Sequence, residues 1–428
     1  MANINIHIIE LGPVKDCELT LAPVMLFTGK SNLGKSYVNF LAYYVYNLFS
    51  SQRLNDFITN KITEDVDKAK KITVTIKASD LRLWMEGDIK AFFQYLLSYK
   101  DIPCQIQFLF SDDVPDKFEF EYIENNIPKK LGSSDYYTAK LSLNGKNNNF
   151  LISGVYKKYA LLYDMTRLLG EVLLGKDIYR SFLFPPGRAS LLSGNYSTQY
   201  SSSRLGLYDI FLRDNDEINR DAMRHPNHMD SFFVSQIHSL INGKLSTDKE
   251  GIYLVLDNGR SIPLDAAASS VKELTPLLLW MQGDFIGEQS VCIEEPEAHL
   301  HPEMQIAVAD LLAACINKGA YMQITTHSDY FLQRFNQLLK LGCLRKKDET
   351  AFNDFCMKNP NTKKCCLDIN KVKAYYFYAE DGWTKMKQME IGEQGIPMST
   401  FFSAVEDLAA RDEAINDEFE KLGESDNC

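Results

Sequence analysis

The chain has 428 residues, of which 45% are hydrophobic and 12% aromatic, which is typical of globular domains and argues against disorder. Its 46 basic and 57 acidic residues give a net charge of −11, which disfavours a general electrostatic grip on nucleic acid. No apolar run reaches the length of a membrane span, and the first residues lack the pattern of a secretory signal. The nine cysteines lack regular spacing, so we expect reduced thiols, a cytoplasmic location and no membrane partner.

The N-terminal third favours β-structure. Alternating or β-rich patterns predict strands over 3–9, 17–21, 24–27, 72–76, 104–110, 117–122 and 139–143. A polar stretch at 144–149 is expected to close this region, and the apolar spacing of 156–174 then predicts a helix.

The apolar run 24–27 leads directly into an octet of the form G-x-x-x-x-G-K-S, and a helix-compatible stretch follows over 37–49. Strand, glycine loop and helix form the context in which this motif cradles phosphates with its backbone N–H groups. We therefore expect the loop and the residue after it to bind a nucleoside triphosphate: Gly29, Lys30, Ser31, Asn32, Leu33, Gly34, Lys35, Ser36 and Tyr37. Lys35 would reach the β- and γ-phosphates, and the Ser36 hydroxyl would ligate Mg²⁺.

The C-terminal half alternates between helices and strands. A polar loop at 190–204 and helical character over 216–240 precede a hairpin formed by 251–256 and 261–264. The pattern then predicts a helix over 269–281, a strand over 290–293, a helix over 302–317 and a strand over 321–325. This alternation is typical of the second half of a nucleotide-binding α/β domain.

Two carboxylates end the strand expected at 290–293. Glu294 would face the metal through a bound water, and Glu295 would polarise the hydrolytic water. His327 follows the next strand, where an imidazole can hydrogen-bond the γ-phosphate. We expect Lys35, Glu295 and His327 to be catalytic, with Ser36 and Glu294 at the metal.

The phosphate loop and these acids are 260 residues apart, so the chain is expected to leave the ATPase core after its first helix, build an inserted module and return. We expect an ATPase lobe with a β-rich subdomain at 1–153 and an inserted helical module at 154–240. A second ATPase lobe is expected at 241–395, and an acidic C-terminal helix and tail at 396–428.

Several strings make the chain similar to the ABC-type ATPase heads of the RecF, SMC and OLD (overcoming lysogenization defect) group. They are E-E-P-E-A-H-L-H-P at 294–302, T-H-S at 326–328, F-P-P-G-R-A at 184–189, and L-G-P-V at 11–14 with L-A-P at 21–23. The resemblance implies an α/β fold, an ABC-type P-loop ATPase head with a β-rich N-terminal lobe and an inserted, mainly helical module. It also implies ATP and Mg²⁺ as cofactors.

In such heads a signature segment begins a helix whose N-terminus completes the ATP site of a second protomer, so the resemblance implies a homodimer or higher homo-oligomer. Ser269 and Ser270 match that segment and would cap the helix and donate to the γ-phosphate. Val271 departs from the glycine usual there. The glutamine that contacts the metal in relatives has three candidates here: Gln94, Gln105 and Gln107.

Three features leave alternatives open. The cysteines at 343, 356, 365 and 366 could hold zinc, although the absence of a C-x-x-C pair favours ordinary thiols. His299 and His301 could ligate a metal, but the family position favours an interface or the edge of the site. Apolar residues at 401, 405, 408, 415, 419 and 422 follow a 4-3 spacing, which fits packing on the head or a contact with a partner.

OLD-family nucleases carry a TOPRIM nuclease domain after the head, whereas the residues beyond His327 contain no D-x-D cluster. The chain thus resembles the ATPase subunit of two-gene anti-phage systems such as PARIS, which implies a separate effector, a nuclease, and a phage-encoded trigger. The alternative is a RecF- or SMC-like ATPase that acts directly on DNA in repair or maintenance. The acidic net charge and the lack of a long coiled coil disfavour it. A head without catalysis that serves as a scaffold is a third possibility.

Overall fold

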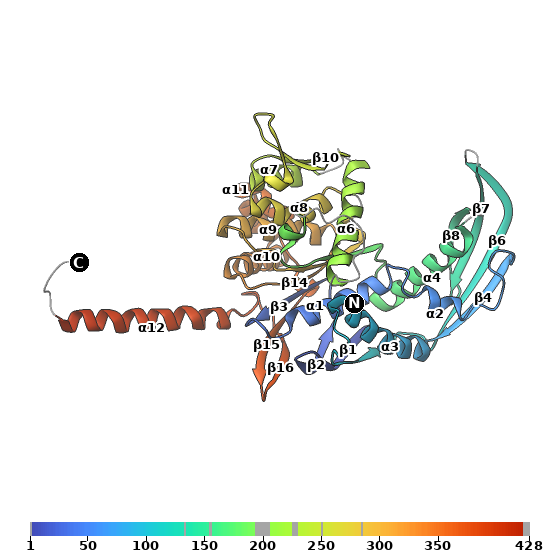
Figure 1. Ribbon diagram of the computed structural model, residues 1–428, viewed down its shortest axis with the longest axis horizontal. Coiled ribbons are helices and arrows are strands. Elements are labelled where there is room, and N and C mark those ends of the chain that lie inside the picture. Colours follow the sequence, from blue (N-terminus) through green and yellow to red (C-terminus); the bar gives the residue numbers. More distant parts are fainter. Residues whose placement is uncertain are drawn as a thin grey trace.

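The computed structural model describes residues 2–131, 134–153, 156–192, 206–224, 230–249, 251–283 and 286–422. Its centre is a nine-stranded sheet built from both halves of the chain, in the order β5-β1-β2-β16-β15-β3-β14-β13-β9 (Figure 1). The strands are β1 (Ile4–Leu11), β2 (Val14–Thr20), β3 (Val24–Gly29), β5 (Cys104–Phe110), β9 (Arg180–Phe184), β13 (Gln289–Glu294), β14 (Tyr321–Thr325), β15 (Val372–Glu380) and β16 (Trp383–Met389).

The functional half of this sheet is parallel. β15, β3, β14, β13 and β9 all run in the same direction, so their carboxyl ends meet at one edge. Such strands are covered on both faces, which explains why β3, β13 and β14 read as nearly continuous apolar runs. The α/β P-loop ATPase fold expected from the sequence is confirmed. The acid-bearing strand β13 is separated from the loop strand β3 by β14.

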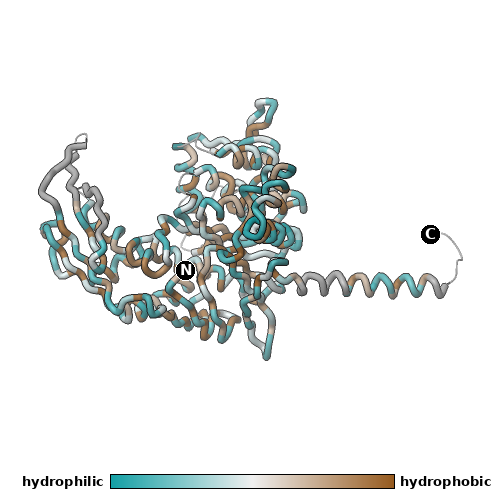
Figure 2. The backbone as a smooth tube through the Cα atoms, turned by 180° about the vertical axis from the view of Figure 1, so that it is seen from behind, coloured by the Kyte–Doolittle hydropathy of each residue, from teal (hydrophilic) through white to brown (hydrophobic). Residues whose placement is uncertain are grey.

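Alternate residues of the central strands feed two separate cores. In β3, Met25 and Phe27 belong to one apolar cluster, whereas Val24 and Leu26 belong to the other. The helix α1 (Lys35–Leu48) packs on the first face, on which β13, β14 and β9 also contact it. The second face is covered by helices that include α7 (Ser231–Ile241), α8 (Ser269–Trp280), α9 (Pro302–Asn317) and α10 (Asp329–Lys347). Hydrophobic residues alternate with hydrophilic ones along the tube, as expected for elements that each bury one face (Figure 2).

A four-stranded sheet, in the order β4-β6-β7-β8, extends from the first face at the end of the molecule opposite the C-terminal helix (Figure 1). The elements of this lobe are α2 (Asn55–Thr59), β4 (Lys71–Lys77), α3 (Ala78–Leu97), β6 (Lys117–Leu131), β7 (Ser134–Leu143), β8 (Lys146–Ser153) and α4 (Lys157–Leu174). The remaining elements are α5 (Arg188–Leu192), α6 (Gly206–Arg224), the small sheet β10 (Lys244–Thr247), β11 (Ile252–Val255) and β12 (Ser261–Pro263), and α11 (Glu349–Lys358).

Most of the predicted elements are confirmed, and several differ. The polar stretch 144–149 does not close the β-rich region, because only Asn144 and Gly145 form a turn and β8 follows directly. The helical region predicted at 216–240 is two helices, α6 and α7. Of the polar loop predicted at 190–204, residues 190–192 belong to α5, and 193–204 lie outside the described residues. Among the described helices, none is both long and apolar enough to cross a bilayer.

The predicted domain boundaries stay a prediction, but the positions of two strands, β5 and β9, show how the chain between residues 1 and 240 relates to the central sheet. β5 lies within the predicted β-rich subdomain and β9 within the predicted helical module, and both are strands of the central sheet. The chain therefore returns to the ATPase sheet twice between the phosphate loop and the two carboxylates.

The C-terminal helix α12 (Ser399–Leu422) projects away from the head (Figure 1). The side chains described in it, 407–419, are exposed, including Leu408, Ile415 and Phe419. The first of the two interpretations of its apolar spacing, packing on the chain's own head, is wrong over this part of the helix.

Candidate functional site

The phosphate loop connects β3 to α1 at the carboxyl edge of the sheet. Gly34 has φ +76° and Gly29 has φ +131°, values that side chains rarely adopt. A Cβ at Gly29 would lie 2.5 Å from the backbone oxygen of Phe377 on β15, so no larger residue fits this position. The loop is therefore fixed both by its own conformation and by the neighbouring strand.

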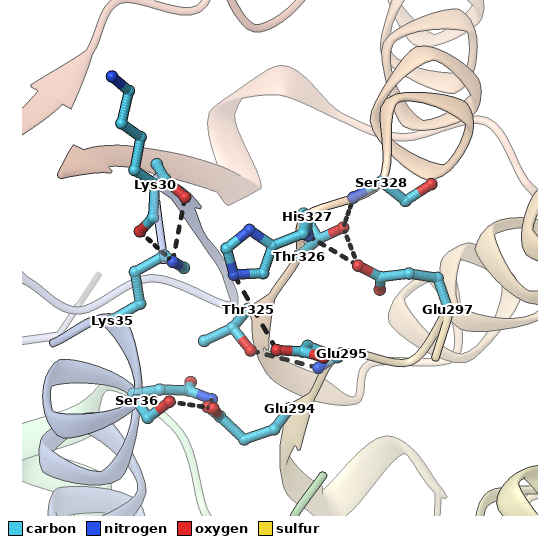
Figure 3. Close-up of polar contacts among 12 residues, drawn as sticks. Lys30, Lys35, Ser36, Glu294, Glu295, Glu297, Thr325, Thr326, His327 and Ser328 are labelled. Atoms are coloured by element: carbon cyan, nitrogen blue, oxygen red, sulfur yellow. Dashed lines mark hydrogen bonds and ion pairs between the residues drawn. The ribbon is translucent and has the colours of Figure 1, made fainter. Parts of the chain in front are cut away.

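Lys35 is folded back into its own loop. Its ammonium group donates to the backbone oxygens of Gly29, at 3.0 Å, and of Lys30, at 2.7 Å (Figure 3). Burial lowers the pKa of Lys35 to about 8, and the nearby Glu294 and Glu295 carboxylates oppose this shift. The amine thus sits in a polar cradle where phosphate oxygens could replace the two carbonyl oxygens.

Glu294 is the last residue of β13 and is almost fully buried beneath the loop. Its carboxylate accepts hydrogen bonds from the Ser36 hydroxyl and, at 2.5 Å, from the Asn39 side-chain amide. Burial raises the pKa of Glu294, and these two donors counteract the rise. Asn39 was not among the predicted site residues. Its position three residues after Ser36, on the same face of the helix, is the sequence signal that could have indicated it.

Glu295 sits on a strained turn directly after the strand. Its φ of +47° lies in the left-handed region, which is uncommon for a residue with a side chain and occurs often at active sites. The turn is held because the Glu295 N–H donates to the backbone oxygen of Thr325, at 3.1 Å, and to its hydroxyl, at 3.2 Å. The carboxylate, about two-fifths exposed, points into the space beside the loop (Figure 3).

His327 faces Glu295 across this space, with 4.0 Å between Nε2 and Oε1. Burial and the charge of Lys35 lower the pKa of His327, which favours a neutral imidazole at neutral pH. The backbone of His327 is positioned by Glu297, whose Oε1 accepts from the His327 N–H at 2.7 Å and from the Thr326 hydroxyl at 2.8 Å. Sequence reasoning gave Glu297 no separate role.

Arg188 supports the acidic segment from behind. It is 1% exposed, and its Nη1 donates to the backbone oxygen of Glu294 at 2.8 Å, while its Nη2 donates to that of Glu295 at 3.3 Å. Its guanidinium also pairs with the buried Glu273 of α8 at 3.0 Å. The motif F-P-P-G-R-A thus carries a positioning residue, which the spacing alone did not indicate.

These segments enclose a cavity of about 500 Å³. The lining is largely the predicted site: Pro13, Ser31, Asn32, Leu33, Gly34, Lys35, Ser36, Tyr37, Glu294, Glu295, Thr325 and His327. The volume falls within the usual range for small-molecule sites. The Ser36 hydroxyl and the Glu294 carboxylate, which both line this cavity, are the kind of oxygen ligands that Mg²⁺ takes, directly or through water, so the residues present fit the metal.

Other predicted residues lie elsewhere. Ser269 is exposed and is the first residue of α8, so it does not cap that helix; Ala268 takes the cap position without a side-chain hydrogen bond. Neither Ser269 nor Ser270 lines the loop cavity of its own chain.

The candidate glutamines and metal-binding side chains also lie apart from the loop. The cavity lining includes none of Gln94, Gln105, Gln107, His299 and His301. In the described part of the chain, no group of three or more His, Cys, Asp and Glu side chains is arranged to hold a metal, and the eight described cysteines are free thiols.

Comparisons with known proteins give three results. Residues 192–332 match the model of the AAA ATPase domain family, which supports an ATPase domain in this chain. No curated protein matches the sequence. Among solved structures, an Smc head bound to the C-terminal winged-helix domain of ScpA is 13% identical with a TM-score of 0.38, covering 91% of this chain and 97% of that one.

Two further SMC heads are similar to the same extent. The head domain from Thermotoga maritima is 12% identical, with a TM-score of 0.35, over 91% of this chain and 100% of that one. An Smc head with an extended coiled coil, bound to the C-terminal domain of ScpA from Pyrococcus furiosus, is 12% identical, with a TM-score of 0.39, over 96% of this chain and 100% of that one.

Proposed function

We propose that this chain binds ATP with Mg²⁺ in the loop cavity and hydrolyses it slowly. The observation that carries the proposal is the convergence, at one edge of the sheet, of the phosphate loop, two consecutive carboxylates and a histidine from three neighbouring strands. A phosphate loop alone supports nucleotide binding. A carboxylate that faces the open part of the same cavity supports hydrolysis.

Each side chain has a role that its position supports. The Lys35 ammonium exchanges its two loop carbonyls for β- and γ-phosphate oxygens of ATP. Ser36 and Glu294 would hold Mg²⁺, which would neutralise the negative charge that develops on the phosphates. Glu295 orients a water and accepts its proton as it attacks the γ-phosphorus, while the neutral His327 donates a hydrogen bond to a γ-phosphate oxygen.

We further propose that a second copy completes the site with the start of α8. Ser269 is exposed and Ser270 half-exposed, outside the cavity of their own chain, which leaves them accessible to a neighbouring molecule. The N-terminus of α8 would present its N–H groups to the γ-phosphate there. Arg188 and Glu273 then link this helix to the backbone of Glu294 and Glu295, so contact at α8 could be transmitted to the hydrolytic carboxylate.

The ATP-bound assembly, in this proposal, controls a separate effector, a nuclease, in defence against phage. One observation supports control of a partner over direct action on DNA: the net charge is −11, which disfavours a general electrostatic grip on nucleic acid.

The effector proposal is tested by phage infection of cells that carry the gene with its native neighbouring genes. We expect protection with the natural chain, and its loss with Lys35→Ala and with Glu295→Gln. The matched control is Lys340→Ala, which removes an exposed lysine on α10 and should preserve protection. If protection is absent, and the purified chain instead binds DNA with a steep salt dependence and hydrolyses ATP faster with DNA, the alternative of direct DNA action replaces this proposal.

A further inference from the structure

A second, larger cavity lies at the opposite end of α1 from the phosphate loop. Its volume is about 730 Å³, and it is lined by the end of α1 and the turn after it (Asn47 to Arg53), by the start of β9 (Arg180 and Ser181), and by α3, α4 and α6. Because α1 has 14 residues, this cavity lies about 20 Å from the loop. It therefore cannot be part of the ATP site of the same chain.

One wall of this cavity is aromatic. The rings of Tyr159 and Tyr163 are stacked with centroids 6.3 Å apart, and Tyr163 contacts Tyr179 edge to face at 6.4 Å. Tyr159 is 50% exposed, so one large ring remains accessible from solvent. The buried Tyr163 hydroxyl has no hydrogen-bond partner within the described part of the chain. A buried hydroxyl without a hydrogen-bond partner lowers the stability of the fold. A polar aromatic ligand that stacks on the rings and hydrogen-bonds to this hydroxyl would remove that cost.

The lining also includes three guanidinium groups, those of Arg53, Arg180 and Arg213. Arg53 is held by Asp88 and lies over the ring of Phe92 at 5.3 Å. Arg180 is held by Asp221 at 2.7 Å and lies 5.0 Å over the ring of Tyr179. Arg180 also pairs with Glu217 at 2.9 Å, so acids fix both guanidinium groups in place.

Arg213 differs from these two arginines. Its side chain is 60% exposed, and its Nη2 lies 3.5 Å from Asp214, at the limit of a hydrogen bond. Asp214 itself is buried and already accepts the N–H of Leu183 at 3.0 Å. Arg213 is thus the cation best able to turn toward an anionic ligand. The other two lining arginines are paired with Asp88, and with Asp221 and Glu217, so Arg213 is the lining arginine whose contact with an acid is weakest.

We infer that this cavity is a second binding site, for a nucleobase that carries a phosphate, with the base on Tyr159 and the phosphate at Arg213. Stacked tyrosines bind bases of any sequence, and arginine is well suited to phosphate. The hydroxyls of Ser50 and Ser181, 3.0 Å apart at the base of the cavity, add donors and acceptors. The ligand is either a free mononucleotide or the 5′-phosphorylated end of a single strand. This inference does not depend on ATP hydrolysis at the loop.

The test is calorimetric titration of the full chain carrying Lys35→Ala, which weakens binding at the loop. We expect saturable binding of a nucleoside monophosphate or of a 5′-phosphorylated oligonucleotide. Binding should weaken at least about tenfold in Tyr159→Ala and in Arg213→Gln. Tyr159→Phe keeps the ring, and Arg220→Gln removes an exposed cation on the same helix, so both should bind like the parent.

The result identifies the source of the ligand. Equal affinity for mononucleotide and oligonucleotide supports a free nucleotide, whereas binding of only the 5′-phosphorylated strand supports a strand end. The inference is overturned if neither ligand binds, if all four variants bind equally, or if a peptide rich in glutamate and tyrosine saturates the site and nucleotides do not. Circular dichroism of each variant verifies that it is folded.

Discussion

At the scale of single residues, the site is built from groups whose burial is offset by specific partners. Glu294 is buried but accepts from Ser36 and Asn39, and Lys35 is partly buried but donates to two carbonyls. Groups of this kind change their proton affinity when a charged ligand arrives, because the ligand replaces both the water and the internal partners.

Lys35 gives the first prediction. Its pKa is about 8 without ligand, and a bound triphosphate raises it by stabilising the ammonium form. ATP affinity should therefore change little below pH 7 and fall by about tenfold between pH 7 and pH 9, with most of the fall above pH 8, as the free chain loses the proton that the complex keeps. Dissociation constants measured at pH 7, 8 and 9 provide the test. In Lys35→Arg the side chain stays charged up to pH 9, so the affinity for ATP should no longer depend on pH in this range. If both proteins show the same pH dependence, a group other than Lys35 causes it.

At the scale of elements, Arg188 connects α5, in which it lies, to α8 and to the end of β13. Arg188→Ala would leave the buried Glu273 uncompensated, and we expect a loss of about 3–5 kcal/mol in the free energy of unfolding. The double change Arg188→Met with Glu273→Gln removes both charges and should recover much of this stability. It should not restore ATP turnover, because the carbonyls of Glu294 and Glu295 still lack their donor. Full turnover in a stable double variant would show that Arg188 is structural only.

The helix α12 gives a prediction at the same scale. Leu408 and Phe419 are about two-thirds exposed, so Leu408→Ser with Phe419→Ser should change the free energy of unfolding by no more than about 0.5 kcal/mol. A matched change in the buried face of α10, Leu338→Ser, should destabilise the chain by several times that amount. Chemical denaturation measures both. A large loss from the α12 pair would mean that this stripe is covered in solution by another copy of the chain.

The elements around the site could be predicted because their signals are local. An apolar run followed by the octet defines β3, and α9 and β14 begin and end where the sequence placed them. The helix α3 was missed although its signal was present, since Leu81, Met85, Ile89, Phe92 and Leu96 recur at helical spacing and are all buried.

The contacts that shape the site could not be predicted in this way. Arg188 lies more than 100 residues from Glu294, and Glu297 supports His327 from 30 residues away. Neither contact leaves a periodic pattern in the sequence, so only the folded sheet brings the partners together.

At the scale of the whole molecule, the loop strand β3 lies between β15 and β14, so strands from the beginning and the end of the chain form one sheet. The site therefore exists only when residues near 30, 294, 327 and 377 have come together. The two cavities lie at opposite ends of α1, so this helix connects the proposed ATP site to the proposed second site.

The most direct test of the central claim is ATP hydrolysis by the purified chain, with oligomer size measured by light scattering on the same samples. We compare the natural chain with Glu295→Gln and with a matched change at an exposed glutamate on α9, Glu303→Gln. We expect Glu295→Gln to lower turnover at least about a hundredfold while it still binds ATP and forms ATP-dependent oligomers, and Glu303→Gln to behave as the natural chain. Equal turnover in all three proteins, or a monomer both with and without ATP, would contradict that claim.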